Sequence, residues 1–404
     1  MIDTDLSMSV RPAVDTRQEI ERLCSFERRA PGTNAERRAA EFLRRRLEEL
    51  GREASLEPIS TFPNYPLTLL LHALVAIAGS VIAVSDPLIG TVALAVVTAS
   101  AAAELLGRFP LARRLTGMRA SQNVVSREHG GKPGTLVLVA HYDSARAASM
   151  LGGRAARRRA RAGRLLRRPI GAFEPFFWSI VVVLACAALR LGGIEGTALT
   201  IVQFIPTVVL IVSVPLLVDA MLAPVVPGAN DNASGVAAVL ALAGRYGGRL
   251  EHLDVWVLLT GAGEGMLSGA REFLRAHRGE LDPVSTAFVC IEAVGSGSVR
   301  YSTKEGELLG YRYHPALLEC CEQLAPEHGA SAIATRTPSD AHVARTRGFP
   351  AISVSCADDL GLARGRHQVD DTPDRIDDAA LERALEFASD VVELIDARVG
   401  SRLD

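Results

Sequence analysis

Four long apolar stretches interrupt an otherwise mixed pattern of hydrophobic and polar positions along this chain of 404 residues. None of the four contains a charged residue: Leu67–Val84, Leu88–Ala103, Pro175–Leu189 and Gly196–Val218. A helix needs roughly 20 apolar residues to cross a bilayer. The third stretch is short for this, although Arg190 can lengthen it by reaching to the interface. The pattern favours two transmembrane helical hairpins over the alternative of buried helices in a large soluble core.

Arginines gather in the segments that adjoin the hairpins on one side. They are Arg108, Arg113, Arg114 and Arg119 after the first hairpin, and Arg154, Arg157, Arg158, Arg159, Arg161, Arg164, Arg167 and Arg168 before the second. The positive-inside bias therefore places everything outside the hairpins in the cytoplasm. The second cluster fits either a contact with anionic lipid headgroups or a solvated linker.

The rest of the chain has an α/β pattern. Strands are predicted at Gln122–Glu128, at Thr135–Ala140 and from Asp254, Thr286 and Ala351 onward, and the first two are expected to be neighbours. Helices are predicted over Asn34–Leu50, Ser234–Tyr246, Ser268–Arg278, Pro315–Leu324 and Ala379–Ala397, with Asn34 as an N-cap. The strands are continuously apolar, which is typical of strands covered on both faces. We expect an α/β fold: a mostly parallel, mixed sheet sandwiched by helices, with the two hairpins inserted.

This pattern divides the chain into five parts. Residues 1–62 are an N-terminal helical part, 63–107 the first hairpin, 108–169 the first strands and the Arg-rich linker, 170–222 the second hairpin, and 223–404 the remainder of the α/β domain. A net charge of −2 gives no reason to expect nucleic acid as a partner. The six cysteines show no paired spacing that would indicate a disulfide framework. The N-terminus lacks the pattern of a signal peptide.

Five short motifs each place a metal-binding side chain after a predicted strand or at a tight turn. They are His141 in LVLVAHYDSA, Asp231 in PGANDNASG, Glu264 in LTGAGEGMLSGAR, Glu292 in VCIEAVGSG and His367 in RGRHQVDD. In open α/β sheets the carboxyl ends of the strands form the ligand-binding edge. Asp143, close to His141, is placed to hold the imidazole by its other nitrogen. Taken singly, such a His is often structural and such an Asp often a helix cap. Together, two imidazoles and three carboxylates favour a pair of zinc ions that share one carboxylate.

In this order the five motifs resemble the zinc-dependent aminopeptidase family, which includes leucyl aminopeptidases, glutamate carboxypeptidase and glutaminyl cyclases. The resemblance covers about Ala30 to Ser60 and Ser121 to Ala397, and it is greatest to a membrane-embedded bacterial branch with similar hairpins. It implies a zinc exopeptidase-like fold and two Zn²⁺ ions. Asp231 would bridge the ions, His141 and Glu292 would complete one, and Glu264 and His367 the other.

The sequence departs from the family at two positions. Glu292 stands where the family more often has Asp. The family also carries adjacent glutamates at the third motif, a general base followed by a metal ligand, and here the ligand position is Glu264 while the base position is Gly263. A positioned base contributes roughly 10²- to 10⁴-fold to rate, so its loss predicts a slow enzyme or an inactive one.

The resemblance also assigns residues around the site. Asp143 and Asp371 would support the metal ligands, and Ser339, Asp340 and His342 lie where the family shapes its substrate pocket. His342 either donates to a tetrahedral oxyanion or is a surface histidine on a helix, and the sequence slightly favours the surface position.

These observations predict a membrane-anchored di-zinc metallopeptidase that removes N-terminal residues from peptides. The alternative is a catalytically impaired protein that binds a peptide or partner, and glutaminyl cyclisation is a third, weaker possibility. The expected partners are a peptide substrate and the lipid bilayer, and the sequence indicates no oligomeric state. The expected location is a bacterial inner or plasma membrane, with the catalytic domain on the cytoplasmic side.

Overall fold

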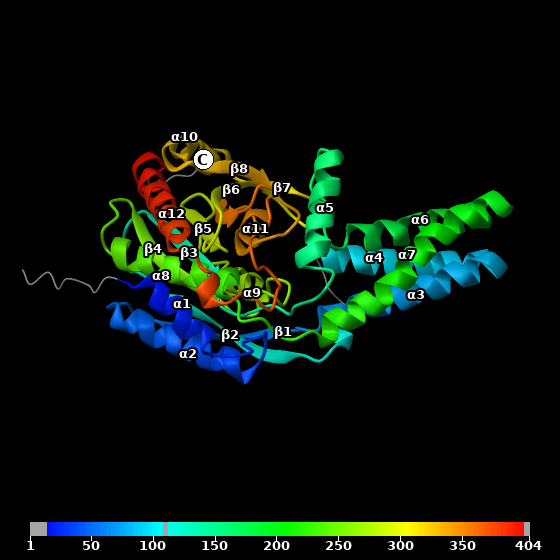
Figure 1. Cartoon of the computed structure of the whole chain (residues 1–404), viewed down its shortest axis with the longest axis horizontal. Helices are drawn as coiled ribbons and strands as arrows, with labels where there is room; N and C mark the ends of the chain where they lie inside the picture. Colours follow the sequence, from blue (N-terminus) through cyan, green and yellow to red (C-terminus); the bar gives the residue numbers. More distant parts are fainter. Residues whose placement is uncertain (1–13, 108–111, 400–404) are drawn as a thin grey trace, which may run out of the picture.

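The computed structural model describes residues 14–107 and 112–399. Figure 1 shows an α/β body from which a bundle of long helices projects, with one separate helix, α5, standing between the two. Arg108 and the first residues of the chain, on which two of the sequence predictions depend, lie outside the described ranges.

The body contains a nine-stranded sheet in the order β1-β2-β4-β3-β5-β9-β6-β7, with β8 paired to β6. The strands are β1 (Ser55–Thr61), β2 (Arg119–Ser126), β3 (Gly134–His141), β4 (Leu253–Thr260), β5 (Thr286–Glu292), β6 (Ser298–Glu305), β7 (Tyr311–Arg312), β8 (Ser331–Ala334) and β9 (Ala351–Ala357). The four central strands β4, β3, β5 and β9 run parallel. Antiparallel pairs lie toward both edges. The predicted α/β class with a mixed sheet is thus confirmed.

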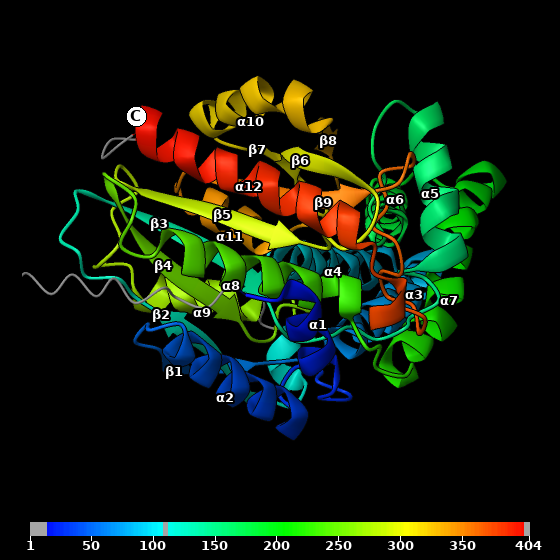
Figure 2. The ribbon, with the colours of Figure 1, turned by 60° about the vertical axis from the view of Figure 1, so that its left-hand side comes forward.

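Helices cover both faces of the sheet, as Figure 2 shows, with α8 and α12 in front and α9 and α11 behind. The helices of the body are α1 (Thr16–Cys24), α2 (Asn34–Glu49), α8 (Gly235–Tyr246), α9 (Ser268–Ala276), α10 (Pro315–His328), α11 (Asp340–Thr346) and α12 (Asp378–Val399). Central strands such as β4 and β5 are buried along their whole length because both faces are covered.

Two details of the prediction are wrong. The strands β2 and β3 are not neighbours, because β4 lies between them, antiparallel to β2 and parallel to β3. The almost wholly buried β3 takes a central position with a parallel partner on each side. The N-cap of α2 is Thr33, not Asn34, since the Thr33 hydroxyl accepts from the Glu36 N–H at 3.2 Å.

The four apolar stretches form helices with a hydrophobic core of their own. They are α3 (Tyr65–Ser85), α4 (Pro87–Leu105), α6 (Glu174–Leu191) and α7 (Thr197–Leu222), each long and apolar enough to cross a membrane. Their outer faces expose large apolar side chains, such as Val81, Val96 and Phe204. These helices are therefore not buried in the core of the α/β body, and exposed apolar side chains in such number are typical of an interaction surface.

The Arg-rich stretch before the second hairpin forms a helix, α5 (Gly153–Leu165), and most of its arginines are exposed. Gly152, which precedes α5, packs closely against the loop that carries His367: a Cβ on Gly152 would lie 2.8 Å from the Arg366 carbonyl oxygen and 2.9 Å from that of His367. The stretch is thus a structural element beside the predicted metal site.

Candidate metal centre

The carboxyl ends of the central strands bring three of the predicted ligands to one edge of the sheet. His141 is the last residue of β3 and Glu292 the last residue of β5, while Glu264 lies in the turn that follows β4. The strands β3 and β4 are in parallel register with His141 opposite Thr260, so that they end at the same level. The edge is the one where ligands gather in sheets of this kind.

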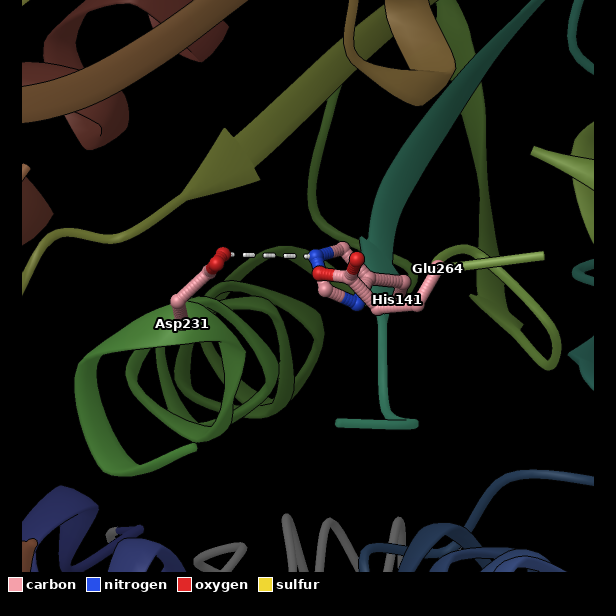
Figure 3. Close-up of side chains that lie close together, drawn as sticks. All are labelled: His141, Asp231 and Glu264. Carbon is pink, nitrogen blue, oxygen red and sulfur yellow. Dashed lines mark ion pairs between the residues drawn. The ribbon is translucent and has the colours of Figure 1, made fainter. Parts of the chain in front are cut away.

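The structure brings all five predicted ligands together around Asp231. The Asp231 Oδ1 atom lies 3.6 Å from His141 Nε2, and its Oδ2 atom lies 3.9 Å from His367 Nε2. His141 Nε2 is also 3.8 Å from Glu292 Oε1, and His367 Nε2 is 3.8 Å from Glu264 Oε2. Figure 3 shows Asp231 on its turn facing His141 and Glu264. This pairing is the one that the family resemblance implies, although the role of these residues as ligands stays a prediction.

Unsatisfied polar atoms at the centre fit a bound cation. Asp231 is fully buried, and neither of its carboxylate oxygens accepts a hydrogen bond, although Arg366 forms an ion pair with Oδ2. A buried carboxylate without a donor is costly unless a cation compensates it. His141, Asp231 and Glu264 each offer one possible metal-ligand atom, and these three atoms all lie within 4.8 Å of one another. Since zinc takes N and O ligands at roughly 2.0–2.2 Å, this set has the size and the chemistry of a zinc site.

Arg366 brings a positive charge into the same cluster, and the sequence analysis did not find it. Its Nε atom lies 3.3 Å from Asp231 Oδ2, and its Nη1 atom lies 3.9 Å from Glu292 Oε2. Burial alone would raise the pKa of Asp231, but Arg366 and His141 outweigh it and hold that pKa below its usual value. Asp231 is therefore an anion in the protein without metal, with Arg366 as its nearest cation.

Burial has the opposite net effect on the other two carboxylates. It raises the pKa of Glu264 to about 8, assisted by the negative charge of Asp231. It also raises the pKa of Glu292 to about 8, although Arg366 and His141 oppose the shift. Both glutamates therefore hold a proton more tightly than an ordinary carboxyl group does, and metal binding here would be coupled to proton release.

Three side chains hold the turn that presents Glu264, because they accept hydrogen bonds from the consecutive backbone N–H groups of this turn. The Gly261 N–H donates to Asn123 Oδ1, the Ala262 N–H donates to Glu36 Oε1, and the N–H groups of Gly263 and Glu264 donate to the two carboxylate oxygens of Asp143 at 2.9 Å each. Asp143 Oδ1 also lies 3.4 Å from His141 Nδ1. Asp143 thus holds the end of β3 and the Glu264 turn in one arrangement, which agrees with its predicted supporting role.

Gly263 has no room for a side chain in this arrangement. A Cβ atom there would lie 2.5 Å from His141 Cβ, 2.8 Å from His141 Cγ and 3.1 Å from Asp143 Oδ1. The glycine at the expected base position is therefore built into the packing of a predicted metal ligand.

The Asp231 turn is fastened to the neighbouring strand and to Asp371. The Asp371 carboxylate accepts the N–H groups of Asn230 at 2.7 Å and Asp231 at 3.0 Å. The Asn232 amide donates to the Ile291 carbonyl and accepts from the Ala293 N–H, next to Glu292. Asp371 therefore positions Asp231, and its support of a metal ligand stays a prediction.

Of the three residues expected to shape the substrate pocket, only His342 lines the cavity beside the metal centre. The preferred surface position of His342 is wrong, since the residue is 7% exposed. Burial and the charge of Arg271 lower its pKa to about 4, so it is neutral at physiological pH. Ser339 and Asp340 lie behind the wall, where Ser339 donates to Glu305 Oε2 and Asp340 accepts from the Thr260 hydroxyl.

The cavity has a volume of about 920 Å³ and extends from the metal centre to α5 and the bundle. His141, Glu264, Glu292 and His367 line its floor. Binding sites for drug-sized ligands span roughly 300–1,000 Å³, so this cavity has room for several residues of a peptide.

Glu36 and Asn123, like Arg366, contribute to the site but were not predicted from the sequence. For Glu36 a signal exists: Thr33 and Glu36 have the spacing of a capping box, in which the glutamate reaches back toward the start of the helix. One Glu36 oxygen does so by accepting from the Gly32 N–H, while the other accepts from Ala262 and from the Ser121 hydroxyl. For Asn123 and Arg366 the sequence carries no local signal.

Comparison with known proteins agrees with this architecture. Residues 213–392 match the model of Peptidase family M28. The fold is similar to those of a glutaminyl cyclase from Bacteroides thetaiotaomicron (TM-score 0.56, 14% identity, covering 95% of this chain and 99% of that one) and a leucine aminopeptidase precursor from the same organism (0.54, 13%, 95% and 98%). It is also similar to that of a Zn-dependent exopeptidase from Parabacteroides distasonis (0.53, 12%, 96% and 99%). No curated protein is similar enough to count as a match. The expected likeness to zinc aminopeptidases and glutaminyl cyclases is thus confirmed.

Proposed function

We propose that this protein is a membrane-anchored metallopeptidase that binds two zinc ions and removes the N-terminal residue of peptides. The match of residues 213–392 to the model of Peptidase family M28 supports the metallopeptidase class. The observation that carries the proposal is the convergence of two imidazoles on the two oxygens of one buried carboxylate, Asp231. The four apolar helices support membrane anchoring.

The residues divide the work in this proposal. His141 and Glu292 would hold one ion, Glu264 and His367 the other, and Asp231 both. Zinc, when bound, supplies a Lewis acid for the scissile carbonyl and lowers the pKa of a bound water. Asp143 keeps the Glu264 turn and His141 in place, and the neutral His342 faces the cavity as a hydrogen-bond donor or acceptor. With glycine at position 263, the site lacks the usual carboxylate that would take the proton from water, so we expect slow turnover.

The test is hydrolysis of a panel of aminoacyl p-nitroanilides by the full-length protein, purified in detergent and loaded with zinc. Asp231→Asn removes the central charge and is expected to abolish both zinc binding and turnover. Asp282→Asn is the matched control, because Asp282 is exposed and accepts only the Val284 N–H two residues along the chain. Equal turnover by the two variants would contradict the proposal.

A second candidate is a protein that binds peptides without cleaving them, and the crowding at Gly263 favours it. The packing also alters the obvious rescue experiment, because a glutamate at position 263 would displace His141 rather than simply restore a base. We therefore separate the candidates by mass spectrometry of bound peptides: intact peptide after long incubation supports binding only, and product supports hydrolysis. A peptide with N-terminal Gln in the panel reports cyclisation through loss of ammonia.

A further inference from the structure

The lining of the cavity beside the metal centre is strongly basic. Nine arginines line the cavity against five carboxylates. Of these carboxylates, Glu264 and Glu292 are predicted ligands, Glu307 accepts from the Phe173 N–H, and Asp358 accepts from two N–H groups of its own loop. Most of the negative charge is therefore already engaged, while part of the positive charge is not.

Five of the nine arginines have partners within the protein. Arg159 donates to the carbonyls of Met150 and Leu151, and Arg168 pairs with Glu174 at 2.8 Å. Arg271, Arg336 and Arg366 likewise have partners. Within the described ranges, the guanidinium groups of Arg157, Arg164, Arg167 and Arg364 have no hydrogen-bond or ion-pair partner, although the Arg364 carbonyl accepts from the Asn230 amide.

The arrangement of α5 turns this free charge toward the cavity. The residues of α5 that line the cavity recur at helical spacing. Three of them are arginines: Arg157, Arg164 and Arg159, of which Arg159 has partners within the protein. The others are small: Gly153, Ala156, Ala160 and Gly163. Arg167 follows directly after the helix and lines the same wall. The small side chains leave room along this wall for a bound peptide, and the arginines offer hydrogen-bond donors to it. The remaining arginines of α5, Arg154, Arg158 and Arg161, do not line the cavity. Both sets are exposed, so the lining of the cavity is what distinguishes them.

We propose that this cavity selects acidic peptides, whose carboxylates downstream of the N-terminal residue bind Arg157, Arg164 and Arg167. The inference rests on the proposed function for the direction of the peptide: the N-terminal residue lies at the metal centre and the following residues extend toward α5. Guanidinium groups are well suited to carboxylates because they can donate two parallel hydrogen bonds. The segment that carries these arginines lies outside residues 213–392, so the family match does not account for it.

The experiment compares three N-terminally free peptides of equal length that differ in the residues after the first two: glutamates, glutamines or phosphoserines. Each is assayed with the zinc-loaded protein in neutral detergent. We expect a kcat/KM about five- to tenfold higher for the glutamate peptide than for the glutamine peptide, since each partly exposed ion pair contributes modestly. Added salt should reduce this preference. A preference for phosphoserine alone, or no preference, would overturn the proposal.

The chain offers a matched pair of variants on the two faces of α5. The triple variant Arg157→Gln, Arg164→Gln and Arg167→Gln is expected to lose the preference, mainly through KM. The triple variant Arg154→Gln, Arg158→Gln and Arg161→Gln removes the same charge from the other face and should retain it. Equal behaviour of the two variants would show that net charge, and not the cavity wall, sets the preference, which refutes the proposal. A loss of binding to anionic vesicles by the first variant, with unchanged peptide preference, would refute it in favour of a lipid-facing helix.

Binding separates this inference from the proposed function. Fluorescence anisotropy of the labelled glutamate and glutamine peptides reports recognition without turnover. Tighter binding of the glutamate peptide that depends on the cavity-facing arginines, without any product, supports the acidic-peptide site and contradicts the aminopeptidase. Hydrolysis of all three peptides at equal rates supports the aminopeptidase and contradicts the acidic-peptide site.

Discussion

Replacing Gly263 by alanine tests whether the glycine is required by the packing of a metal ligand. The new Cβ atom would lie 2.5 Å from His141 Cβ and 2.8 Å from His141 Cγ. Carbon atoms in contact lie roughly 3.5–4.0 Å apart, so the backbone or the imidazole must move by about 1 Å. His141 Nε2 would then leave its place near Asp231 and Glu292, both of which now lie within 4 Å of it.

The expected size of the effect follows from two terms. Overpacking of a buried site costs about 1–3 kcal/mol of folding free energy. A disturbed ligand orientation weakens metal binding about 10- to 100-fold. Gly117→Ala is the control, because a Cβ atom there meets nothing within 4 Å. A glycine-to-alanine change at a compatible position is neutral or stabilises by roughly 0.4–1 kcal/mol.

The assay is competition for zinc between each purified variant and a chromogenic chelator, together with melting temperatures with and without zinc. Gly263→Ala should bind zinc more weakly than Gly117→Ala and should gain less thermal stability from it. Equal zinc affinity of the two variants would refute the packing argument, and Gly263→Glu would then become a valid way to restore the base.

Three further predictions concern the surroundings of the site. Asp143→Asn leaves one of the Gly263 and Glu264 N–H groups without its carboxylate acceptor, so zinc affinity should fall about 10- to 100-fold in the same competition assay; unchanged affinity would show that Asp143 does not position the ligands. Burial raises the pKa of Glu307 to about 7, so the folded state holds this proton more tightly than the unfolded state, and the associated stability is lost as pH rises toward and through 7. The melting temperature of Glu307→Gln, relative to that of the unchanged protein, should therefore be higher at pH 8 than at pH 6. A difference that stays constant with pH would contradict the shift. In the bundle, Gln203 accepts from Arg190 at 2.9 Å and donates to the Ser80 carbonyl at 2.7 Å, so Gln203→Leu should destabilise the detergent-solubilised protein by about 1–3 kcal/mol, whereas an unchanged melting temperature would mean that the network contributes nothing.

The five predicted ligands could be chosen from the sequence because each follows a predicted strand or lies at a tight turn. An apolar run that ends in a histidine or an acid, such as Val139 to His141 or Cys290 to Glu292, predicts both a buried strand and a functional residue at its end. The pairing of His141 with Glu292 and of Glu264 with His367 came from the family resemblance, and the parallel register of β3, β4 and β5 gives it a physical basis.

What the sequence did not reveal depends on contacts between distant segments. Arg366 reaches Asp231 across more than a hundred residues of chain, and the Ala262 N–H finds its acceptor in Glu36 near the N-terminus. The burial of His342 follows from its packing beside Tyr311, whose ring centroid lies 5.6 Å away. The order of β2, β4 and β3 is likewise a result of pairing that no local pattern encodes.

The ends of the apolar helices are part of the cavity wall: Tyr65 begins α3, Leu105 ends α4, and Phe173 precedes α6, and all three line the cavity. If these helices span a bilayer, a change in its hydrocarbon thickness alters their tilt and with it the shape of the entrance. The length of the lipid tails in a nanodisc, or of the detergent chain in a micelle, is then a variable of the kinetics, and rates measured in one amphiphile do not transfer to another without a check.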